Sequence, residues 1–143
     1  MKVSTVLSFK GDCEAAFKFY EQHLGGQPGP IFRYAGSPMA DSVPPDWRDK
    51  IMHGSIVVGD HLLMGGDVAD AGQYEAPKGF SLSLQMSDTA EAERIYNALV
   101  PNGTVLMPLE KTFWAARFGS VVDRFGIPWL INCEEPAQPG ETV

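Results

Sequence analysis

The sequence predicts an α+β protein in which a βαβββ module occurs twice, with helices outside a curved, U-shaped mixed sheet. Three observations support this fold class. Alternating apolar and polar residues indicate strands, apolar stripes at helical spacing indicate two helices, and both halves of the 143 residues show the same order of elements. One helix cannot fully cover the sheet of its module, so two modules together are expected to enclose a pocket.

The first module is expected over residues 1–66. Residues 3–9 (VSTVLSF) alternate and predict a strand. Asp12 is then in position to cap a helix over residues 13–24, because a short carboxylate can accept hydrogen bonds from the first backbone N–H groups of a helix. Gly25-Gly26 follows directly and is expected to end this helix.

Three strands complete the first module. Residues 30–35 predict a short strand, and a polar, Pro-rich loop (AGSPMADSVPPDWRD) separates it from the next one. Residues 50–66 (KIMHGSIVVGDHLLMGG) predict a hairpin that turns at Gly59-Asp60. The loop over residues 67–78 then leads to the second module.

The second module is expected over residues 79–133. Residues 80–86 alternate and predict its first strand. Asp88, with Glu91 three residues later, forms the capping-box pattern at the start of a helix, which Pro101-Asn102-Gly103 is expected to end. The apolar stripe of this helix has helical spacing and consists of Ala92, Ile95, Tyr96, Leu99 and Val100.

Three further strands, over residues 104–109, 114–122 and 127–133, repeat the order of the first half. The two helices match at an offset of 76, which aligns Asp12 with Asp88. The last ten residues, 134–143 (EEPAQPGETV), are expected to form a flexible tail.

Charge and composition exclude several classes of function. The net charge of −7 argues against nucleic-acid binding, which needs clustered Lys and Arg. No apolar run is long enough to span a bilayer, and the N-terminus does not resemble a signal peptide, so a cytoplasmic protein without a membrane partner is expected. The two cysteines, Cys13 and Cys133, have no metal-binding spacing and fit a reducing compartment as buried, inert thiols.

Local motifs resemble one protein family. The segments FKGDCEAAFKFYEQHLGG, KIMHGSIVVGDHLLMGGD and FWAARFGSVVDRFGIPWLINC look like the first helix, the central hairpin and the C-terminal signature of PhnB-like proteins. These belong to the vicinal oxygen chelate superfamily, which includes glyoxalases, bleomycin-resistance proteins and extradiol dioxygenases. The resemblance covers roughly residues 1–133 and implies a single glyoxalase-like domain over residues 1–143, with the bleomycin-resistance fold.

The resemblance also implies where a metal would be bound. Metal-dependent members take His and Glu ligands from the first and last strands of each half. Counted from Asp12, these positions fall at Thr5, Ser81, Met64 and Leu130. Hydroxyl and thioether groups do not hold a divalent ion without anionic or imidazole ligands. The usual metal site is therefore predicted to be absent, and no cofactor is expected.

Six side chains are candidates for contact with a ligand: Thr5 and Ser81, at the first-strand positions named above, and four others. The resemblance points to His53 in the third strand, where the alternative is a His hydrogen-bonded within the sheet. Trp114, Arg117 and Phe118 lie in a shared motif: Trp114 would offer a flat apolar wall and Arg117 a site for an anion. Their alternative roles are to cover the core and to pair with Asp123 or Glu110.

Three functions follow from these observations. The first is a small-molecule-binding protein without a metal, which sequesters or senses its ligand. The second is a metal-dependent lyase, isomerase or dioxygenase with a rebuilt site near His53. The third is a dimeric scaffold whose pocket is vestigial. A homodimer is expected in each case, because relatives commonly cover their sheet edges and cavity rims by pairing chains.

Overall fold

The computed structural model describes residues 1–135, which fall into two compact units, one over residues 1–76 and one that begins at residue 77. The expected tail therefore lies almost wholly outside the described residues, since only Glu134 and Glu135 belong to them. Within the described part, no helix is both long and apolar enough to cross a membrane.

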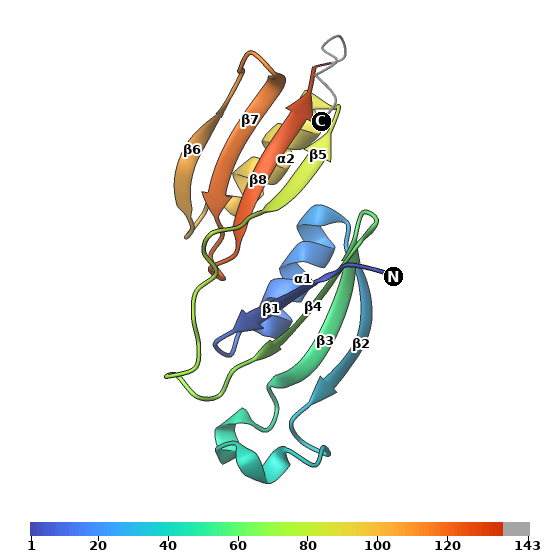
Figure 1. The fold of residues 1–143 in the computed structure, drawn as a ribbon, viewed down its shortest axis with the longest axis vertical. Coiled ribbons are helices and arrows are strands. Elements are labelled where there is room, and N and C mark those ends of the chain that lie inside the picture. The colour runs from blue at the N-terminus through green and yellow to red at the C-terminus, as the bar shows by residue number, and fades with distance from the viewer. Residues whose placement is uncertain (136–143) are drawn as a thin grey trace. The chain divides into compact units, whose positions relative to one another are not determined.

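The first unit contains one helix and a four-stranded mixed sheet (Figure 1). Its elements are β1 (Thr5–Phe9), α1 (Cys13–Leu24), β2 (Gln27–Arg33), β3 (Ile51–Val58) and β4 (His61–Asp67), with two 3₁₀ turns, Ala40–Ser42 and Pro45–Trp47, between β2 and β3. The strand order is β1-β4-β3-β2. The first strand pairs in parallel with the last one, and the other neighbours are antiparallel.

The second unit repeats this plan. Its elements are β5 (Leu82–Met86), α2 (Thr89–Leu99), β6 (Thr104–Glu110), β7 (Ala115–Val122) and β8 (Pro128–Glu134). The strand order is β5-β8-β7-β6, again with the first and last strands parallel. The predicted α+β class and its two βαβββ modules are thus confirmed.

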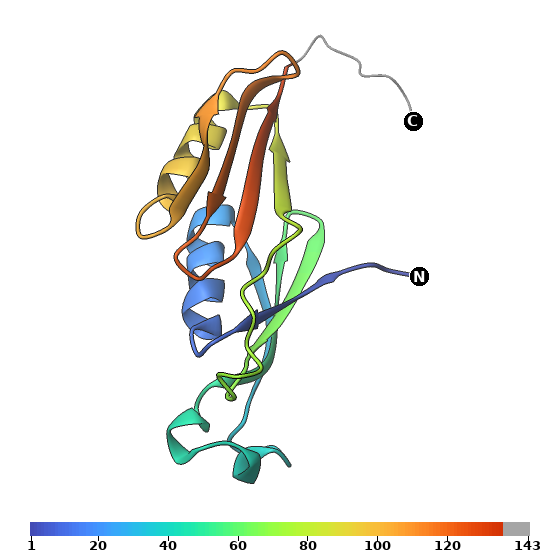
Figure 2. The ribbon, with the colours of Figure 1, turned by 60° about the vertical axis from the view of Figure 1, so that its left-hand side comes forward.

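Each helix packs on one face of its own sheet, as Figures 1 and 2 show. The side chains beneath the helices form two cores. That of the first unit includes Leu7, Phe9, Tyr20, Ile56 and Leu63, and that of the second includes Ile95, Leu99, Val121, Trp129 and Ile131. The face of each sheet that is turned away from the helix, called the open face below, is covered by no element of its own unit.

The N-terminus of α1 differs from its prediction. Asp12 holds the N-cap position, but its side chain accepts no capping hydrogen bond. The carboxylate of Asp67, at the end of β4, does so instead: Oδ1 accepts from the N–H groups of Gly11 (3.0 Å) and Cys13 (2.9 Å), and Oδ2 accepts from Ile51 (2.9 Å). Helix α2 follows the prediction, because the Asp88 side chain accepts from the N–H of Ala90.

The turn between β7 and β8 is organised around the buried side chain of Asp123. Its Oδ1 accepts from the N–H groups of Phe125 and Ile127, and its Oδ2 accepts from Nε1 of Trp129 at 2.9 Å. The same carboxylate thus organises the turn and anchors the largest side chain of the second core.

The strands of the two units match at a different offset from the helices. Leu7 and Phe9 in β1 face the helix, as do Leu84 and Met86 in β5, which pair with the buried Ile131 and Cys133. These strand positions are 77 residues apart (84 − 7), whereas the helix caps Asp12 and Asp88 are 76 apart. The first strand–helix connection is therefore one residue longer, and it includes Gly11 at φ +117°.

Candidate functional site

The open face of the second sheet carries the most varied set of side chains. Pairing across β7 and β8 places Phe118 beside Asn132 and Ser120 beside Leu130. The pairing of β5 with β8 adds Ser83 and Gln85 to the same face, because directly paired residues share a face. Residues of three strands thus form one surface with apolar, aromatic and polar parts.

An aromatic pair borders this surface. The rings of Trp114 and Phe118 lie 5.3 Å apart between centroids, in an edge-to-face arrangement. Trp114 remains 45% exposed, and the neighbouring ring of Phe113 contacts it at 4.7 Å. The hydroxyl of Thr112 accepts from the N–H of Ala115 at 3.1 Å, which fixes the backbone where β7 begins. Trp114 thus offers an exposed apolar ring that Phe118 supports from the side.

Asn132 is the polar group of this face that sequence reasoning missed. Its Oδ1 atom is buried and has no hydrogen-bond partner among the described residues. A buried amide oxygen without a donor costs free energy, so a donor supplied by a ligand would be stabilising there. The alternation in WLINC, which puts position 132 on the same face as Leu130, was the signal that could have identified it.

Arg117 lies on the other face of the same strand. It pairs with the buried Cys133 in the ladder, and its Nε is 3.4 Å from Oε1 of Glu93 on α2. Its Nη1 donates to the carbonyl oxygen of Ala116 at 2.7 Å. The guanidinium is thus engaged on the helix side, and the structure brings Trp114 and Phe118 together without it.

The open face of the first sheet contains His53. This side chain is exposed and lies opposite Phe32 of β2. Ser55, two residues along, is on the same face and pairs with Met64. Thr5 is on the helix side instead, where its hydroxyl lies 2.9 Å from Nε2 of His61.

The observed pairing redefines the positions at which a metal would be expected. Ser81 precedes β5, and the open-face neighbours of Met64 and Leu130 are Val6 and Ser83. The four open-face positions are thus Val6, Met64, Ser83 and Leu130, and none of them carries a carboxylate, an imidazole or a thiolate. Among the described residues, no group of three or more His, Cys, Asp or Glu side chains is arranged to hold a metal ion. The donor set at these positions does not fit a divalent ion.

Comparison with known proteins gives consistent results. The family model of the Glyoxalase/Bleomycin resistance protein/Dioxygenase superfamily matches residues 2–131. Protein YjdN of Escherichia coli (strain K12) is 31% identical over 148 residues, which cover 96% of this chain and 100% of YjdN.

Two solved structures show the same fold. Protein PA1353 of Pseudomonas aeruginosa is 48% identical and superimposes with a TM-score of 0.83, over 94% of this chain and 98% of PA1353. The PhnB protein of Bacillus cereus is 22% identical, with a TM-score of 0.80 over 93% of this chain and 99% of that protein. At that identity, the second likeness concerns the fold alone.

Proposed function

Because the chain belongs to the Glyoxalase/Bleomycin resistance protein/Dioxygenase superfamily, we propose that it binds a small molecule on the open face of its second sheet, without the metal ion of the catalytic members. The expected ligand carries an aromatic ring and a hydrogen-bond donor. Members of this superfamily bind small molecules and often dimerise. The proposal adds to this a location and a chemical preference.

One observation carries the proposal. An edge-to-face aromatic pair lies beside Asn132: the half-buried Phe118 of β7 pairs with it, and the exposed Trp114 directly precedes this strand. The amide oxygen of Asn132 is buried and has no donor among the described residues. A ring packed against the pair would bury apolar area. An N–H or O–H group on that ring would satisfy the Asn132 oxygen, so the two contacts together select a planar donor.

The side chains at the metal positions support binding without a metal. Val6, Met64, Ser83 and Leu130 offer two aliphatic groups, a thioether and a hydroxyl. His53 is the one imidazole on the open face of the first sheet, and a single imidazole holds a divalent ion weakly. These four positions favour contact with a carbon skeleton over coordination.

A matched pair of probes tests the proposed site. Indole has a ring N–H, and 1-methylindole has the same ring without this donor. We expect indole to shift the amide NMR signals of Phe118, Ser120 and Asn132, and to bind several-fold more tightly than 1-methylindole, because one hydrogen bond contributes about 0.5–1.5 kcal/mol. Asn132→Leu is expected to remove this difference.

The control variant is Asn97→Leu, which makes the same change on the exposed surface of α2. It is expected to leave the preference for indole intact. Equal binding of both probes to the wild-type protein, or shifts confined to other surfaces, would refute the proposed site.

A second experiment tests whether the protein binds a metal. Protein incubated with zinc, nickel, iron or manganese and then desalted is expected to retain no stoichiometric metal. Stoichiometric retention that His53→Ala abolishes would refute the metal-free proposal.

Exposed apolar side chains on the edge strands support the further proposal that the chain forms a homodimer. Phe32 of β2 is 56% exposed, and Leu106 and Met107 of β6 are 58% and 45% exposed. Large apolar side chains exposed on edge strands are typical of surfaces that a partner covers. A second copy would bury these side chains.

A further inference from the structure

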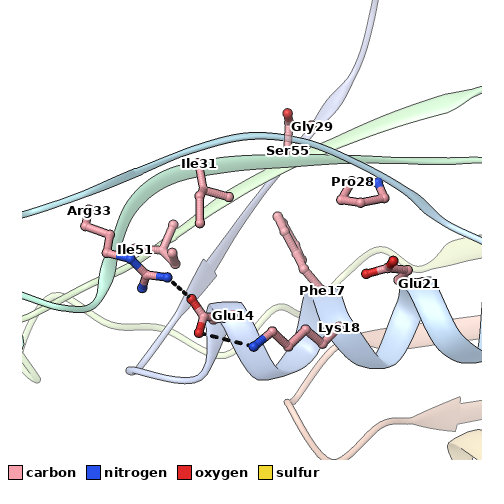
Figure 3. A pocket seen from close by; sticks show the side chains of 10 residues that line it. All are labelled: Glu14, Phe17, Lys18, Glu21, Pro28, Gly29, Ile31, Arg33, Ile51 and Ser55. Atoms are coloured by element: carbon pink, nitrogen blue, oxygen red, sulfur yellow. Dashed lines mark hydrogen bonds and ion pairs between the residues drawn. The ribbon is translucent and has the colours of Figure 1, made fainter.

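A pocket of about 250 Å³ lies between α1 and the edge strand β2, on the helix side of the first sheet (Figure 3). All its lining residues belong to the first unit, whereas the site proposed above lies on the second sheet, so the two are separate. The pocket exists because α1 packs mainly on β3 and leaves β2 at its flank.

The floor of the pocket is apolar. Phe17 of α1 rises toward the sheet in Figure 3 and meets Ile31 and Ile51 of β2 and β3. Phe17 and Ile51 belong to the buried core, whereas Ile31 is 46% exposed and forms the outer wall. A compact hydrocarbon group placed against Ile31 would therefore remove apolar surface from water without disturbing the core.

The rim carries four charged groups, three of which are already engaged. Glu14 forms an ion pair with Arg33 and lies 3.5 Å from Nζ of Lys18. Arg33 also donates to the carbonyl oxygen of Asp49 at 2.7 Å. The hydrogen bond from Arg33 holds the pKa of the Glu14 carboxyl below its ordinary value, so Glu14 stays charged and paired at neutral pH.

Glu21 is the fourth charged group, and it has no ion-pair partner among the described residues. Its side chain leaves α1 on the pocket side, next to Phe17 and facing Pro28 of β2 (Figure 3). An anionic ligand would find the two cations already paired and an uncompensated carboxylate beside it. A cationic ligand would meet an available counter-ion within an acidic protein of net charge −7.

We propose that this pocket binds a small amphipathic amine, with its ammonium group at Glu21 and its hydrocarbon part against Phe17 and Ile31. The volume is below the roughly 300–1,000 Å³ of pockets that enclose drug-sized ligands, so the ligand is small. The exposed position of Glu21 makes the ionic contact weak, and the apolar floor supplies most of the affinity.

The internal repeat provides a comparison within the chain. At the helix offset of 76, the positions of Phe17 and Glu21 correspond to Glu93 and Asn97 of α2. Glu93 pairs with Arg117, and Asn97 is uncharged. The second module therefore keeps the fold without this combination of an aromatic floor and an unpaired carboxylate, so the combination is not a requirement of the fold.

Phenethylamine is the probe for this site, because it joins a phenyl ring to an ammonium group. We expect it to bind with a millimolar Kd and to shift the amide NMR signals of Phe17, Glu21 and Ile31 in the full-length protein. Phenylacetate, which has the same ring and the opposite charge, is expected to cause no such shifts. Glu21→Gln is expected to weaken phenethylamine binding about three- to five-fold.

Two further variants complete the test. Glu75→Gln makes the same substitution at an exposed loop residue outside the pocket and is expected to leave the Kd unchanged. Ile31→Trp fills the outer wall at an edge-strand position and is expected to abolish the shifts. The proposal is overturned if phenylacetate binds as well as phenethylamine, if Glu21→Gln binds like the wild type, or if the shifts fall on Phe118 and Asn132 and so report the open face.

Discussion

The carboxylate of Asp67 ties together three segments of the first unit, and its removal has a calculable cost. Asp67 is 3% exposed and accepts hydrogen bonds from the N–H groups of Gly11, Cys13 and Ile51. In Asp67→Ala the two donors in buried hydrogen bonds, those of Cys13 and Ile51, lose their acceptor. At about 2 kcal/mol for each orphaned donor, the first unit is expected to lose about 4 kcal/mol of unfolding free energy.

The Asn variant refines this estimate. Asp67→Asn keeps one oxygen, which can still accept from Gly11 and Cys13, but it turns an amide N–H group toward the N–H of Ile51. One buried donor is then lost, and the expected cost is about 2 kcal/mol. The exposed Asp60, in the turn between β3 and β4, provides the control: Asp60→Asn is expected to change stability by less than about 0.5 kcal/mol.

Amide hydrogen exchange is the suitable assay, because it reports each unit separately. A loss of about 4 kcal/mol corresponds to roughly a thousandfold faster exchange of the core amides of the first unit, such as those of Tyr20 and Ile56. Amides of the second unit, such as that of Val121, are expected to be unaffected. A cost below about 1 kcal/mol for Asp67→Ala, or a larger cost for Asn than for Ala, would refute the role assigned to this carboxylate.

Two further predictions concern a buried thiol and the oligomeric state. Burial, followed by the charge of Asp67, raises the pKa of the Cys13 thiol from 9.0 to about 12. The thiol is therefore expected to resist iodoacetamide in the folded protein at pH 8. Because the thiol ionises readily only in the unfolded chain, the free energy of unfolding is expected to fall between pH 9 and 12, and to fall less steeply in Cys13→Ala. Light scattering at micromolar concentration is expected to give the mass of a dimer, and Leu106→Glu to shift it toward the monomer; a monomeric wild-type protein would contradict the dimer proposal.

The sequence predicted those parts of the fold that depend on local pattern. The span of α1 and the turn at Gly59-Asp60 were both foreseen, because periodicity and turn residues determine them. The prediction that the Asp12 side chain caps α1 was wrong. The acceptor is Asp67 instead, which is 54 residues away from Cys13 in the sequence and is brought next to it by the sheet. A strand over 30–35 was also misplaced: β2 spans Gln27–Arg33, and its prolines are tolerated on an edge strand.

The candidate site was foreseen less completely than the fold. Trp114 and Phe118 were identified together from the motif shared with the family, and the structure places their rings in contact. Counting back from Asp12 selected Thr5, whereas the open-face position of β1 is its neighbour Val6. The count was off by one because the first strand–helix connection is one residue longer than the second, which shifts the register between the repeats. Alternation could have placed Asn132 on this face, but the burial of its amide oxygen depends on all the neighbouring strands and has no signature in the sequence.

The parallel pairing of the first and last strands in each unit has a consequence for synthesis. The strand β1 gains its neighbour only when β4 has been made, so the first unit closes at Asp67, the residue that also caps α1. Domains generally fold as units, the N-terminal one first. The first unit can therefore complete its sheet before the whole of the second unit has left the ribosome, and the carboxylate that closes this sheet is the last part of it to emerge.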